Sequence, residues 1–169
     1  TTVDCMVQAS EHQGASVIEC LVNCVIFNHG THNWIADRDT RADRSIILRH
    51  GEKMIFGKDN DKGLALDYSQ GLIPQLIVVP ADDERVLTHD ATTTDPTLHR
   101  MLAMMGQDTP SNSQSPIANT PLPIALGVIR RVAMESYDAA VNQQINEVRG
   151  KSKAKTFDQL TQTLEQWEV

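Results

Sequence analysis

The sequence contains few aromatic residues and no long hydrophobic run. Phe, Trp and Tyr make up only 4% of its 169 residues, so the core must be built from aliphatic side chains and methionine. No apolar run approaches the roughly 20 residues that span a bilayer, and the chain does not open on a signal-peptide pattern. We therefore expect a soluble, cytoplasmic protein with no membrane partner.

Basic residues are outnumbered by acidic ones. Fifteen Lys and Arg against 22 Asp and Glu give a formal net charge of -7. This excess opposes non-specific binding to phosphate backbones, so we expect no nucleic-acid partner. The 40% of hydrophobic residues is enough for a buried core in one or two domains.

Common catalytic and nucleotide-binding signatures are also missing from the sequence. It contains no Gly-x-Ser-x-Gly elbow, no Walker A loop and no Gly-x-Gly-x-x-Gly. His29 and His32 have a spacing that could share a zinc ion, but no third ligand stands out near them, and we expect a surface loop. His89 and Asp90 are adjacent, and in an extended chain such neighbours face opposite sides, so one does not orient the other.

The three cysteines, Cys5, Cys20 and Cys24, are an odd number without a secretory signal, which argues against a disulfide framework. In a strand, Cys20 and Cys24 would lie roughly 13 Å apart, beyond the ~7 Å limit for a disulfide. Cys24 follows a nearly continuous apolar run and precedes Asn28-His29-Gly30, so a buried strand would deliver its thiol to a turn. Such a thiol could bind a metal or cluster, although buried cysteines more often only pack.

The pattern of the chain predicts an α/β fold. The uninterrupted apolar character of residues 16–24 is typical of a parallel strand covered on both faces. Because such a strand needs neighbours on both sides, we expect a sizeable N-terminal portion to precede this sequence. The remaining predicted elements are helix 4–12, strands 54–56 and 76–79, a helix from Asp95 to Met105 ended by Gly106, strand 124–132, helix 136–149, and a last helix opened by a capping box at Thr156 and Gln159.

Several short segments resemble one family over nearly the whole chain, the beta subunits of 2-oxoacid:ferredoxin oxidoreductases, and within it the second half of the subunit acting on 2-oxoglutarate. The segments are Glu11-His12-Gln13-Gly14, residues 22–28, Asp39-Thr40-Arg41, His50-Gly51, residues 55–59, Lys62-Gly63, His89-Asp90, residues 123–130 and Trp167-Glu168-Val169.

The resemblance implies CoA-dependent oxidative decarboxylation of a 2-oxo acid, with electrons passed through a [4Fe-4S] cluster to ferredoxin. It also implies thiamine diphosphate, Mg²⁺ and a partner alpha subunit, and it makes Cys24 one cluster ligand. The domains expected from it are the end of the thiamine-diphosphate-binding domain at 1–30, a C-terminal region of the subunit at 31–106, a linker at 107–121 and a C-terminal strand and helix extension at 122–169.

The sequence departs from the family pattern in what it lacks. The Gly-Asp-Gly segment that holds Mg²⁺ and diphosphate is absent, and so are the other three cluster cysteines. We therefore expect thiamine diphosphate and Mg²⁺ to be bound outside this chain, and the chain to be inactive without the N-terminal half of the subunit. The alternative is a non-catalytic α/β interaction module whose cysteines only pack.

Overall fold

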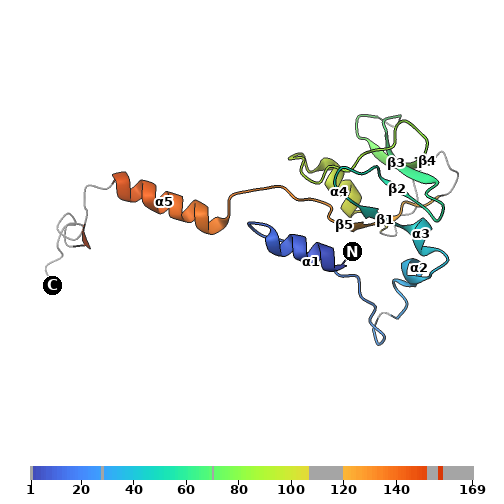
Figure 1. Cartoon of the computed structure of the whole chain (residues 1–169), viewed down its shortest axis with the longest axis horizontal. Coiled ribbons are helices and arrows are strands. Elements are labelled where there is room, and N and C mark those ends of the chain that lie inside the picture. The colour runs from blue at the N-terminus through green and yellow to red at the C-terminus, as the bar shows by residue number, and fades with distance from the viewer. Residues whose placement is uncertain (1, 28, 70, 107–119, 152–155, 158–169) are drawn as a thin grey trace. The chain divides into compact units, whose positions relative to one another are not determined.

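A computed structural model describes residues 2–27, 29–69, 71–106, 120–151 and 156–157. The chain divides into two compact units, the first formed by Thr1–His12 and Ser16–Val132, the second by Gln13–Ala15 and Ala133–Val169. The elements along the chain are α1 (Thr2–Glu11), α2 (Asn33–Ala36), α3 (Arg41–Arg44), β1 (Ser45–Leu48), β2 (Ile55–Phe56), β3 (Lys62–Asp67), β4 (Gln75–Pro80), α4 (Thr97–Ala103), β5 (Ile124–Gly127) and α5 (Tyr137–Lys151) (Figure 1).

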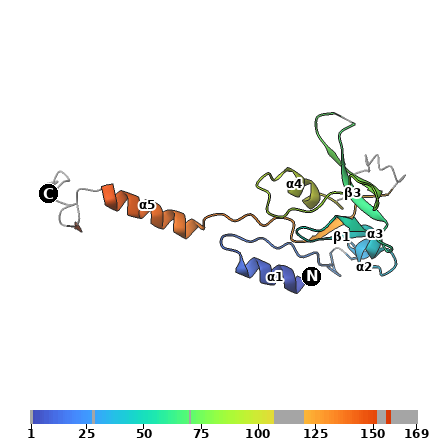
Figure 2. The same ribbon diagram turned by 45° about the horizontal axis from the view of Figure 1, so that its top comes forward.

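Strands β2, β3 and β4 form an antiparallel sheet in that order. β3 and β4 pair along their full lengths in a twisted hairpin, with Leu64 opposite Val78 (Figure 2). Leu76 to Val79 are all buried, and the strand ends at Pro80, because proline cannot donate to a ladder. The predictions of strands at 54–56 and 76–79 are confirmed.

A second sheet consists of β1 and β5, which run parallel, with Ser45 opposite Ile124 and Leu48 opposite Gly127. Gly127 has φ +100°, and a Cβ on it would lie 2.6 Å from the carbonyl oxygen of Leu48. Glycine is therefore required where the two strands end. The predicted strand 124–132 is shorter in the structure, because regular pairing with β1 stops at Gly127.

Helix α4 packs on the core that both sheets share. Leu102 is fully buried, and Met105 beyond the helix end is nearly so. Asp95 accepts hydrogen bonds from the backbone N–H and the hydroxyl of Thr97, at 2.9 and 2.7 Å, in a turn just before the helix. The N-cap is Pro96 and makes no side-chain cap bond, so the predicted N-cap at Asp95 lies one residue too early, and the helix ends at Ala103 instead of Met105. Gly106 ends the turn at φ +74°, and a Cβ there would lie 2.8 Å from Cβ of Ile124.

The prediction of a buried strand at 16–24 is wrong for the described structure. Residues 16–23 adopt no regular element and all are exposed, with Val17 95% exposed. Further along the same run, Phe27 is 90% exposed. The physical reason is that no described strand lies beside this segment to pair with its backbone and cover its side chains. The segment is apolar in sequence, but its side chains are exposed among the described residues.

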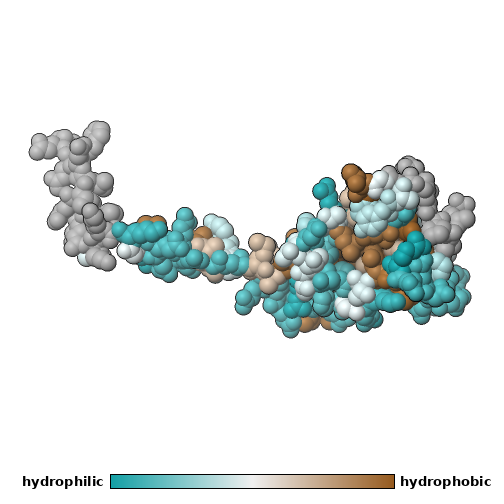
Figure 3. Space-filling model, turned by 90° about the horizontal axis from the view of Figure 1, so that it is seen from above, coloured by the Kyte–Doolittle hydropathy of each residue, from teal (hydrophilic) through white to brown (hydrophobic). Residues whose placement is uncertain are grey.

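The described part of the second unit consists mainly of α5, where the predicted helix 136–149 is confirmed within two residues at its C-terminal end. None of its residues is buried, and the helix surface in Figure 3 is mostly hydrophilic. The predicted linker at 107–121 and the last helix from Thr156 lie almost entirely outside the described residues. Among the described helices, none has the length and apolar character that crossing a membrane requires.

Mixed helices, a parallel strand pair and an antiparallel sheet make this an α/β structure. Helix α1 confirms the predicted helix 4–12, apart from its ends, and the turn that follows contains Gly14 at φ +120°. The short strands β1 and β3 were not predicted from the sequence.

Candidate functional site

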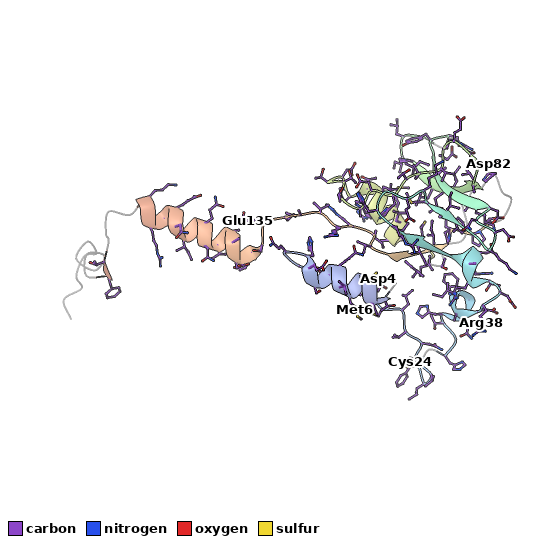
Figure 4. All side chains as sticks on the ribbon, viewed as in Figure 1. Asp4, Met6, Cys24, Arg38, Asp82 and Glu135 are labelled. Atoms are coloured by element: carbon purple, nitrogen blue, oxygen red, sulfur yellow. The ribbon has the colours of Figure 1, made fainter. Side chains whose placement is uncertain are left out.

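Cys24 lies on the loop between α1 and α2 (Figure 4). Its side chain is exposed, and the backbone N–H of Phe27 donates to its Sγ at 3.5 Å. One residue earlier, Asn23 Oδ1 accepts the N–H of Gly30 at 3.0 Å, and Gly30 has φ +80°, which glycine adopts readily. These two contacts fold the chain back on itself, so Cys24 presents an accessible thiol from a tight turn.

The other two cysteines do not join Cys24 in a site. Cys5 is partly buried on α1 and Cys20 is exposed in the extended segment, and neither forms a disulfide with Cys24. Within the described ranges, no three His, Cys, Asp or Glu side chains come close enough to hold a metal ion. Among the described residues, Cys24 thus belongs to no group of three such side chains.

His29 and His32 are close to Cys24 in sequence, five and eight residues away. His29 is exposed and His32 partly so. They belong to no ligand group in the part of the chain that the structure describes, so the zinc hypothesis gains no geometric support.

Asp90 contacts His50 instead of its neighbour His89. The distance from Asp90 Oδ1 to His50 Nδ1 is 3.4 Å, and the N–H of Ala91 donates to the same Nδ1 at 3.2 Å. The prediction that Asp90 does not orient His89 is thus confirmed. Thr92 donates its hydroxyl and its backbone N–H to Asp90 Oδ1, and these bonds lower the pKa of Asp90.

The pairing of His50 with Asp90 was missed by sequence reasoning because 40 residues separate them. Backbone bonds bring the two segments together: Gly51 N–H donates to His89 O at 2.8 Å, and His89 N–H donates to Glu52 O at 2.9 Å. Gly51 has φ +82°, and the His50-Gly51 pair was the available signal of a turn there.

His50 also lines a cavity of about 480 Å³. This cavity includes the residues at and just beyond the carboxyl ends of β1 and β5, among them Arg49 and Val128, where parallel strands commonly place ligands. Arg49 is paired with Glu52 at 3.5 Å, so opposite charges balance on this wall. The lining carries two acidic residues, Asp4 and Glu52, and two arginines, Arg49 and Arg131, so its charges do not favour ligands of either sign.

His89 and His99 are buried beside this region, at 1% and 3% exposure. Their rings meet edge to face with centroids 6.1 Å apart. His89 Nε2–H donates to Val128 O at 2.9 Å, and His99 Nε2–H donates to Asp90 O at 2.8 Å. Burial lowers the pKa of His89, which its bond to the Val128 carbonyl partly offsets.

The acidic run at 82–84 lies at the surface. Asp83 holds Arg85 in a two-pronged ion pair, with Oδ1 to Nε at 3.0 Å and Oδ2 to Nη2 at 2.7 Å, while Asp82 is exposed (Figure 4). Lys62, the first residue of β3, is paired with Asp43 of α3 at 2.6 Å. Among the described residues, these charged side chains form no group that could hold a metal ion.

Comparison with known proteins points to one relative. The chain is 27% identical over 148 residues to a Mycobacterium tuberculosis protein named 2-oxoglutarate oxidoreductase subunit KorB, and the match covers 88% of this chain. The chain spans 36% of the length of that relative. No protein-family model matches the chain. No solved structure matches it either.

The relative is named as a subunit of an oxidoreductase. The similarity extends over most of the chain, so it includes both the Cys24 loop and the sheets in the same polypeptide. The relative's name includes 2-oxoglutarate, but the name does not identify any residue of this chain as a ligand of a metal or cluster.

Proposed function

We propose that this chain is part of the beta subunit of a 2-oxoacid:ferredoxin oxidoreductase, with 2-oxoglutarate as the substrate. The similarity to a 2-oxoglutarate oxidoreductase subunit over 88% of the chain carries the proposal. The reaction is CoA-dependent oxidative decarboxylation to an acyl-CoA, with ferredoxin as the electron acceptor. The partners are the N-terminal half of the subunit, an alpha subunit and ferredoxin.

Cys24 is the residue of this chain that we assign to a [4Fe-4S] cluster. A cluster of this kind takes four cysteine thiolates, and the described residues offer no second thiol beside Cys24, so the other three come from outside this chain. Three features of Cys24 suit a ligand: exposure, a tight turn, and an N–H donated to its sulfur. Hydrogen bonds to cysteine sulfur are one means by which proteins tune cluster potentials.

The described residues offer no set suited to Mg²⁺ and diphosphate, so thiamine diphosphate with its Mg²⁺ is assigned to the rest of the subunit. When bound there, thiamine diphosphate supplies the carbon nucleophile that decarboxylation of a 2-oxo acid requires. In this assignment Cys24 takes no part in proton transfer. Its role is to bind the [4Fe-4S] cluster and so to hold the cluster beside the first unit.

The test compares Cys24→Ser with Cys20→Ser in the complex reconstituted anaerobically with the N-terminal half and the alpha subunit. Both cysteines are exposed and lie in the same segment, so Cys20→Ser is a matched control. We expect Cys24→Ser to lose iron, acid-labile sulfide and the electron paramagnetic resonance signal of the reduced cluster, and Cys20→Ser to keep them. An unchanged cluster signal in Cys24→Ser would show that Cys24 is not a cluster ligand.

A non-catalytic interaction module is the second candidate, and the exposed apolar run 17–27 favours it. Surfaces of this kind mark contacts with other proteins. Anaerobic reconstitution with the partner subunits separates the two functions. Thiamine-dependent oxidation of 2-oxoglutarate with visible cluster absorbance supports the oxidoreductase, and a stable complex with neither property supports the module.

A further inference from the structure

The two buried histidines connect three separate segments of the first unit. His89 belongs to the loop after β4, and its Nε2–H donates to Val128 O just beyond β5. His99 belongs to α4, and its Nε2–H donates to Asp90 O in the same loop. A further backbone bond, from Arg131 N–H to Ala91 O at 2.6 Å, runs beside the His89 contact.

These bonds define which ring nitrogen of each histidine carries a proton. A carbonyl oxygen can only accept, so each Nε2 carries a proton, and each neutral ring leaves Nδ1 as an acceptor. Neither Nδ1 has a hydrogen-bond partner among the described residues, and both atoms are buried. On His89, a second proton would place a charge and an unsatisfied donor on Nδ1 in this interior, which costs free energy.

We propose that His89 and His99 form a latch, which holds the segment after β5 and helix α4 against the loop 87–92 at neutral pH and is released when His89 takes up a proton. The inference does not depend on the proposed oxidoreductase function. The released segment, residues 128–132, is the one through which the chain leaves the first unit toward α5.

The charged groups around His89 favour release over a stabilised imidazolium, whereas Asp90 and Asp95 interact with His99. Two imidazoles face His89, His99 from α4 and His50 from the end of β1, and positive charge on either opposes protonation. Asp90 on the loop itself acts in the other direction, but its Oδ1 is held by Thr92. From the β5 side, Arg130 donates to Thr94 O. Arg131 adds a second positive charge on that side.

Hydrogen exchange at the Arg131 amide tests the latch directly, because its bond to Ala91 O crosses the same contact. The measurement uses NMR on the full 169-residue chain between pH 7.5 and 5.5, with rates corrected for the intrinsic effect of pH. We expect protection at Arg131 to fall by about tenfold over this range, the factor that corresponds to one pKa unit. Amides in the β3–β4 ladder should keep their protection.

His89→Gln supplies the decisive variant. Glutamine can place an N–H near the position of Nε2 but cannot take up a proton at that pH, so protection at Arg131 should become independent of pH. His29→Gln, at an exposed histidine, should behave as the wild type. Equal pH dependence in wild type and His89→Gln, or none in either, would overturn the proposal.

A measurement on the wild type alone guards against a variant that fails to fold. The carbon-bound ring protons of His89 report its titration by NMR. If His89 titrates near the ordinary value of about 6.5 while Arg131 stays protected, the latch does not exist. If loss of protection and titration coincide below that value, the latch stands.

Discussion

Two regions of this chain are rich in aliphatic side chains, yet only one of them forms a core. In the sheet β2–β3–β4, Leu64 and Val78 are completely buried, whereas in the segment 17–27 most apolar side chains are largely exposed. The sheet buries its side chains because β3 has strands on both edges and α4 belongs to the same core cluster. A hydrophobic segment is therefore buried only where neighbouring strands or helices pack against it.

Limited proteolysis should show the largest difference between the two regions. Chymotrypsin should cut the native chain after Phe27, 90% exposed, far faster than after Phe56, 4% exposed, because cleavage at Phe56 requires the sheet to open. Mass spectrometry of the first fragments measures this. In the reconstituted complex, protection of Phe27 would show that a partner covers the segment. Cleavage after Phe56 as early as after Phe27 would contradict the difference in burial between the two regions.

Truncation of a core side chain should have the next largest effect. Leu64→Ala leaves a cavity between strands and should lower the free energy of unfolding by about 2–5 kcal/mol. Val22→Ala, at a position 76% exposed, should change it by less than about 0.5 kcal/mol. Urea unfolding followed by circular dichroism compares the two. Equal effects would mean that the segment is buried in solution.

Gly127 allows a test of the parallel pair. Gly127→Ala combines an unfavourable positive φ with a clash against Leu48 O, and we expect a loss of about 1–3 kcal/mol in urea unfolding. Gly71→Ala is the matched control, because Gly71 also has positive φ, +132°, but an added Cβ meets nothing within 4 Å. The difference between the variants reports the clash. No difference would mean that β1 and β5 are not in close contact.

The smallest expected effect is at the turn after β4. Arg85 lowers the pKa of Asp83 to about 2, mainly by its side-chain hydrogen bonds. Since this pKa lies below the ordinary 3.8, the contribution to stability is present above pH 4 and is lost as the pH falls toward 2. Arg85→Gln should raise the pKa of Asp83 toward 3.8, as carbon-13 NMR of the carboxyl group would measure. Because the pair is exposed, the melting temperature at pH 7 should hardly change.

Local signals in the sequence predicted the elements that local chemistry determines. Pro80 ends an apolar run and Asp95 forms a turn just before a helix, and both features are visible in a few residues. β1 was missed because its four residues lie between charged segments, and its pairing with β5 joins positions 79 residues apart along the chain.

The candidate site divides in the same way. Cys24 could be selected from its place at the end of an apolar run, but its exposure could not, because it reflects the lack of a neighbouring strand among the described residues. His50 and Asp90 come together through backbone pairing between distant segments, so no spacing rule could have found them. Burial of His89 and His99 likewise arises from the three-dimensional packing of several elements.

Gly106 and Ile124 lie in close contact, so packing holds these two positions near each other. The separation of these two positions is thus fixed by packing among the described residues. Loop-closure entropy grows so slowly with length that doubling the length of the chain between them would cost only about 0.6 kcal/mol. This stretch is accordingly where a reporter domain or affinity tag could be spliced into the polypeptide while the strand register is retained.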